Sequence, residues 1–126
     1  LSHIERLAFD FFRPNIDFHL SENSGIFTVA ALEQLGGRFV PHLEYLLKER
    51  PKICVHIEPI AELLDEKNLL DRLSIDYFNK RNYLKGFLTY LRELEKENKI
   101  VIHKAQRTYI GSLFIEGYSA VVWSPK

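Results

Sequence analysis

The chain has little of what marks several classes of protein. It contains one cysteine, Cys54, and no methionine among its 126 residues, so a disulfide framework is excluded. No apolar run approaches the roughly 20 residues that a membrane-spanning helix requires, and the first residues lack the pattern of a secretory signal peptide. These absences predict a cytoplasmic protein that does not cross a membrane.

An excess of charge of one sign is also lacking. Lysine plus arginine and aspartate plus glutamate number 17 each, which leaves no basic surplus of the kind that nucleic-acid binding requires. The five histidines show no pairing at metal-ligand spacing, and a single cysteine adds no ligand set. A P-loop and a Gly-x-Ser-x-Gly nucleophile motif are absent as well. We therefore expect neither a nucleic-acid partner nor a bound metal.

What is present is the composition of a folded domain. Hydrophobic residues make up 46% and charged residues 27% of the chain, values typical of globular rather than disordered proteins. No repeat or low-complexity linker divides the sequence. Residues 1–126 are therefore expected to belong to a single domain.

Hydrophobic periodicity alternates between that of strands and that of helices along the chain. It predicts a short strand ending near residue 12, buried strands over 26–32 and 53–57, and two further strands over 99–109 and 118–123. Helical spacing fills the intervals after Gly37, before Asn79 and around Leu88. This alternation predicts an α/β sheet with right-handed crossovers. The link over 110–117 is too short for a crossover helix, so the sheet should be mostly parallel with an antiparallel last strand.

Open α/β sheets bind ligands outside the carboxyl ends of their strands. That rule first selects Asp10 and Phe11, where a carboxylate can accept a hydrogen bond from an adenine amino group and a ring can stack on the base. The alternative is that Asp10 caps a turn before Pro14 while Phe11 belongs to the core. The rule also selects Ala31 to Gln34. Glu33 is a candidate for the site, or else a cap on the next helix.

The segment His56-Ile-Glu-Pro59 is the third candidate. Strand alternation places His56 and Glu58 on the same side of the sheet, and Pro59 turns the chain as the strand ends. A histidine and a carboxylate within reach of one another suit the deprotonation of a substrate hydroxyl or amine. The alternative for His56 is a buried side chain with a structural hydrogen bond.

Two polar segments could contact a substrate. Arg81, Asn82 and Tyr83 lie between two amphipathic helices, and Arg107 precedes the last turn region. Such groups suit an anionic or sugar-like small molecule, although a solvated connection between helices would have the same composition.

The order of three segments resembles the later part of class I S-adenosylmethionine-dependent methyltransferases. The segments are Ala31-Leu-Glu-Gln34, Val55-His-Ile-Glu-Pro59 and the ending from Tyr118 to Trp123-Ser-Pro125. The resemblance implies a Rossmann-like sheet, S-adenosylmethionine as cofactor and methyl transfer to a small-molecule or sugar-type substrate. It also implies that the main chain at Ala31 and Leu32 lies near the methionine end of the cofactor. Gln34 stands where these enzymes frequently have a histidine.

The family's glycine-rich cofactor turn is missing. The six glycines include no Gly-x-Gly, so we expect these residues to be the C-terminal half of such a domain. A homodimer is possible, because half a sheet exposes a strand edge. Two alternatives stay open at this point: another nucleotide-binding α/β enzyme, such as an oxidoreductase, and a non-catalytic interaction module.

Overall fold

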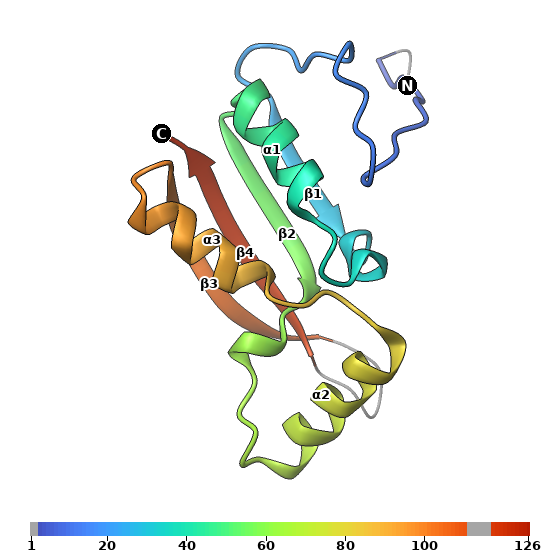
Figure 1. The fold of residues 1–126 in the computed structure, drawn as a ribbon, viewed down its shortest axis with the longest axis vertical. Helices are drawn as coiled ribbons and strands as arrows, with labels where there is room; N and C mark the ends of the chain where they lie inside the picture. Colours follow the sequence, from blue (N-terminus) through green and yellow to red (C-terminus); the bar gives the residue numbers. More distant parts are fainter. Residues whose placement is uncertain (1–2, 111–116) are drawn as a thin grey trace.

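A four-stranded mixed sheet organises the chain (Figure 1). The computed structural model describes residues 3–110 and 117–126. The strands follow the order β1-β2-β4-β3 across the sheet. Their bounds are β1 Gly25–Val29, β2 Ile53–Pro59, β3 Ile100–Ile110 and β4 Tyr118–Pro125.

The strand directions differ in part from those expected. Strands β1 and β2 are parallel, with Gly25 opposite Ile53, whereas β4 is antiparallel to both β2 and β3. The antiparallel pairing of the last two strands is confirmed. The expectation of a mostly parallel sheet is wrong, since one strand pair is parallel and two are antiparallel. The reason is that β4 inserts between β2 and β3. It thereby separates two strands that share a direction and turns one potential parallel pair into two antiparallel pairs.

Three α-helices and two short 3-10 helices connect these strands: η1 Leu32–Leu35, α1 Val40–Glu49, η2 Ala61–Leu63, α2 Leu69–Arg81 and α3 Phe87–Lys96. Helix α1 has Pro41 in its first turn, where a missing N–H costs nothing. It ends at Glu49, and its C-cap Arg50 adopts the left-handed conformation directly before Pro51. The side chain of Asn68 caps α2 by accepting a hydrogen bond from the Asp71 N–H.

Helices α1 and α3 cover one face of the sheet (Figure 1). Alternate strand residues that point to this face, including Cys54, His56 and Trp123, are fully buried. The opposite face is less protected, since Phe27 is 77% and Val29 59% exposed. Most of the core therefore lies between the sheet and these two helices.

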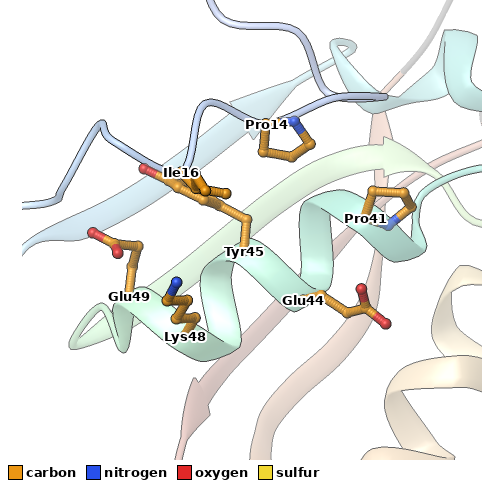
Figure 2. Close-up of a pocket in the computed structure, with 7 residues that line it drawn as sticks. All are labelled: Pro14, Ile16, Pro41, Glu44, Tyr45, Lys48 and Glu49. Carbon is orange, nitrogen blue, oxygen red and sulfur yellow. The ribbon is translucent and has the colours of Figure 1, made fainter.

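The N-terminal segment packs against α1 and adds no strand to the sheet. The strand expected to end near residue 12 is wrong: residues 3–24 contain no strand. The Asp10 carboxylate accepts a hydrogen bond from the Phe12 N–H and bends the chain, so the apolar run serves packing instead of pairing. Farther along, Pro14 and Ile16 lie over Tyr45 of α1 at a cavity of about 260 Å³ (Figure 2).

Candidate functional site

The carboxyl ends of β1 and β2 meet at the side chain of Glu58. This carboxylate accepts hydrogen bonds from the backbone N–H groups of Ala31 at 3.1 Å, Leu32 at 3.1 Å and Glu33 at 3.2 Å. It has no exposed surface. The first amides of a helix have no partner inside the helix, and here one carboxylate from the neighbouring strand satisfies them. Glu58 thus holds the loop that leads from β1 into η1.

The loop itself leaves β1 earlier than expected. The strand ends at Val29 rather than Leu32, because Ala30 adopts a φ of 49°. A positive φ is unfavourable for alanine. The conformation is held on both sides, since the Ala30 N–H bonds to the Ile57 carbonyl at 2.9 Å and the next three amides bond to Glu58. Ala31 is exposed and Leu32 is buried.

Burial raises the pKa of Glu58 above its ordinary value. Hydrogen bonds from the Thr28 side chain and from the Leu32 and Ala31 amides lower the pKa again, and the charge of Glu33 raises it. The carboxylate is therefore costly to bury but well provided with donors. This arrangement suits a positioning role for Glu58 in the loop.

His56 lies deeper in the same face of the sheet. Its Nε2 accepts a hydrogen bond from the Trp123 indole at 3.0 Å, and its Nδ1 lies 2.8 Å from the Thr28 hydroxyl. Burial, with the nearby His42 as a second cause, lowers the pKa of His56 to about 3. Both ring nitrogens are thus engaged inside the protein. This geometry favours the structural alternative for His56, and its role as a catalytic base stays a prediction.

Glu33 is the more accessible carboxylate of the site. Its side chain is partly exposed and accepts a hydrogen bond from the Tyr118 hydroxyl at 2.9 Å. Burial raises the pKa of Tyr118, and its hydrogen bond to Glu33 raises it further, so the phenol stays protonated and acts as a donor. The side chain of Glu33 therefore binds a strand residue rather than capping a helix. Sequence reasoning missed Tyr118, because only the strand order places the start of β4 beside the end of β2.

Of the two proposed substrate contacts Arg81 and Tyr83, the structure brings only Tyr83 near Glu33 and Tyr118. Tyr83 packs its ring against Tyr77 and Phe78, with centroids 5.9 and 6.0 Å away. Burial raises the pKa of Tyr83, and the charge of Glu33 contributes to that shift. Arg81 is exposed and lies with its guanidinium 5.4 Å from the centroid of the Tyr77 ring.

Arg107 is committed to an ion pair that the sequence did not reveal. Its two terminal nitrogens bond to the carboxylate of Asp71 at 2.8 and 3.0 Å, and its guanidinium lies 5.0 Å from the centroid of the Tyr109 ring. A bidentate pair of this kind is geometrically specific. It ties α2 to β3, and the expected contact of Arg107 with a substrate stays a prediction.

Asp10 and Phe11 lie in the turn against α1. Asp10 accepts the Phe12 N–H at 2.8 Å, and the Phe11 ring meets the His42 ring edge-on with centroids 4.7 Å apart. The turn and packing alternatives thus describe both residues in this structure, while their contact with an adenine ring stays a prediction.

Residues 3–110 and 117–126 contain no group of three or more His, Cys, Asp or Glu side chains that could hold a metal ion. Over the same residues, no helix is long and apolar enough to span a bilayer. Comparison with known proteins finds no matching family model, no matching curated protein and no matching solved structure.

Proposed function

We propose that this chain supplies part of an S-adenosylmethionine-dependent methyltransferase that acts on a small-molecule or sugar-type substrate. The observation that carries the proposal is the Glu58 carboxylate, which holds the main chain of Ala31–Glu33 directly after a parallel strand. The resemblance in sequence puts the methionine end of the cofactor beside this main chain. An antiparallel last strand beside β2 agrees with the same family.

The residues present fit such a cofactor in part. An α-amino group needs acceptors, which the carbonyls of the loop can provide. An α-carboxylate needs donors, yet the three amides of the loop already donate to Glu58. These engaged amides and the absence of a Gly-x-Gly turn support the proposal that the 126 residues supply one side of a cofactor site.

We assign the proton-accepting role to Glu33. S-adenosylmethionine, when bound, supplies an electrophilic methyl group on a sulfonium. With the cofactor bound, a substrate hydroxyl that accepts the methyl group would lose its proton, and the Glu33 carboxylate would take that proton. The Tyr118 hydroxyl orients this carboxylate, and Glu58 positions the backbone that carries it. Tyr83, Arg81 and Arg107 remain the proposed substrate contacts.

Calorimetry on the isolated chain is the first test. We expect no micromolar binding of S-adenosylmethionine or of NAD, because the donors for the cofactor carboxylate are missing. Micromolar binding of S-adenosylmethionine by the 126 residues alone would contradict the half-site proposal. Micromolar binding of NAD would favour the alternative oxidoreductase.

The second test concerns the reaction. The coding sequence upstream of Leu1 shows whether a strand, a Gly-x-Gly turn and a helix precede these residues in frame. In a protein that carries both parts, Glu33→Gln should lower methyl transfer by about 100-fold or more, the usual contribution of a general base. Glu58→Gln should lower turnover more than it weakens cofactor binding. Full activity in Glu33→Gln would remove the proposed base.

A non-catalytic interaction module is the second candidate, and the exposed edge of β1 favours it. The bonds from Lys52 N–H to the Ser24 carbonyl and from Ala30 N–H to the Ile57 carbonyl show that even-numbered residues bond to β2. Backbone groups alternate in direction along a strand, so those of Phe27 and Val29 point outward. If the upstream coding sequence holds no cofactor turn, this candidate becomes the preferred one.

A further inference from the structure

A second cavity lies between the N-terminal segment, β1 and α1. Its volume is about 190 Å³, somewhat larger than the roughly 150 Å³ of an engineered protein cavity that binds benzene. The walls are mainly aromatic and aliphatic, and they include Phe9, Phe11 and Tyr45. Phe18 and Phe27 also line it and are 37% and 77% exposed. The cavity therefore reaches solvent at this rim.

One polar side chain in the wall lacks a partner. His42, in the first turn of α1, is only 3% exposed, and neither of its ring nitrogens has a hydrogen-bond partner among the described residues. Two unsatisfied groups at one buried side chain are unusual, since each costs about 1–3 kcal/mol. The neighbouring aromatic rings contact His42 by their edges and faces and provide no donor or acceptor comparable to an amide or hydroxyl.

The chemistry of His42 specifies what would satisfy it. Burial lowers its pKa to about 4, so at neutral pH the imidazole carries one N–H donor and one acceptor nitrogen. A hydroxyl group likewise donates one hydrogen bond and accepts others. A single water molecule occupies about 30 Å³ and would leave most of this apolar cavity empty. A planar ring that carries one hydroxyl matches the walls, and its hydroxyl can satisfy one of the two ring nitrogens of His42.

We propose that the cavity at His42 is a binding site for a small aromatic alcohol of the phenol class. The ring lies among the phenylalanine side chains at the wall, and its hydroxyl hydrogen-bonds to the imidazole of His42. Thr28 also lines the cavity. Its hydroxyl bonds to His56 and its side chain interacts with Glu58, so a ligand in the cavity would lie next to these hydrogen-bonded residues. The proposal does not depend on methyl transfer.

The test compares phenol with toluene, which has nearly the same shape and no hydroxyl. Both are titrated into the full chain while the NMR signals of the Phe11 and His42 rings are followed. We expect phenol to saturate these signals with an affinity about tenfold higher than that of toluene. In His42→Phe, phenol should bind about five- to tenfold more weakly than in the wild type, while the affinity for toluene should stay unchanged. His42→Gln should keep part of the preference for phenol over toluene, because an amide both donates and accepts hydrogen bonds.

The exposed His103, which bonds to Ser124, provides the matched control, and His103→Phe should bind both compounds as the wild type does. Should His42→Phe fail to fold, the ¹⁵N shifts of the His42 ring in the wild type decide, because phenol should move them and toluene should not. Equal affinities for phenol and toluene would overturn the proposal. So would the absence of a saturable change at Phe11 and His42, which would mean that the cavity holds water only.

Discussion

The indole N–H of Trp123 donates a hydrogen bond to Nε2 of His56 across 3.0 Å. Because an indole nitrogen is only ever a donor, Nε2 must be the unprotonated nitrogen of His56. The proton of the neutral ring then resides on Nδ1 and is donated to the Thr28 hydroxyl 2.8 Å away. The Thr28 hydroxyl can then donate its own hydrogen to the Glu58 carboxylate, with which the Thr28 side chain forms a hydrogen bond. One tryptophan in β4 thus orients a chain of donors that reaches the loop after β1.

Replacing Trp123 tests this chain of donors. Trp123→Phe removes the donor to His56 and part of a fully buried ring, so the free energy of unfolding should fall by about 2–4 kcal/mol. Denaturant unfolding measures the loss. In the same variant, the ¹⁵N shifts of His56 should report a mixture of tautomers instead of the single Nδ1–H form. A single unchanged tautomer would show that Trp123 does not determine it.

Acid should destabilise the fold before its carboxylates are neutralised. Burial lowers the pKa of His42 to about 4 and that of His56 to about 3, whereas an unfolded histidine titrates near 6.5. The unfolded state therefore binds more protons below pH 6.5, and stability falls as the pH decreases. By pH 5 each histidine should reduce the free energy of unfolding by about 2 kcal/mol.

Glu58 acts in the opposite direction, since its raised pKa favours the protonated folded state as the pH falls. The measurement is the denaturant midpoint at pH 7, 6 and 5. His42→Phe serves as the control, because it should flatten this pH dependence by roughly half. A wild-type stability that is constant from pH 7 to 5 would contradict the buried neutral histidines.

Glu58→Gln should loosen the loop after β1. An amide offers one acceptor oxygen where the carboxylate offers two, so at least one of the amides of Ala31, Leu32 and Glu33 loses its partner. We expect a loss of about 1–3 kcal/mol in stability and faster hydrogen exchange at these three amides. Glu62→Gln is the control, because Glu62 bonds to an exposed amide at Thr89 and should leave exchange at residues 31–33 unchanged.

Gly117→Ala should strain the contact between α2 and the residue that directly precedes β4. A Cβ at this position would lie 2.1 Å from Cζ of the buried Phe78 ring, so the ring or the backbone must move. The free energy of unfolding should fall by about 1–3 kcal/mol. In a Phe78→Leu background the smaller side chain leaves more room, so Gly117→Ala should lower the free energy of unfolding by less. Gly37→Ala is the matched control, since a Cβ there meets nothing within 4 Å. Equal stabilities of the two alanine variants would contradict the close approach.

The isolated chain should self-associate through β1. This strand lies at the edge of the sheet and exposes Phe27 and Val29, and such uncharged edges favour pairing with another strand. Light scattering should therefore give a mass above the 14.8 kDa of one chain. Phe27→Lys should restore the single-chain mass. Leu69→Lys on α2 should not, although Leu69 is 72% exposed. A monomeric wild type would contradict edge pairing.

The sequence by itself determined most of the helices and strands and the position of Glu58. Helical spacing and the two apolar strands locate α1, α3, β1 and β2, because local periodicity reports which side of an element is buried. The alternation of His56 and Glu58 also correctly predicts that both face one side of the sheet. Their placement at a strand's carboxyl end needs only the order of strand and turn.

Only the tertiary structure decided what these residues contact. The insertion of β4 between β2 and β3 brings Trp123 to His56 and places Tyr118 beside Glu33, and no local pattern encodes such distant pairs. The apolar run at Phe9 to Phe12 has the composition of a strand, yet packing against α1 outweighs its strand propensity. Periodicity reports burial, whereas hydrogen-bond partners depend on which strands become neighbours.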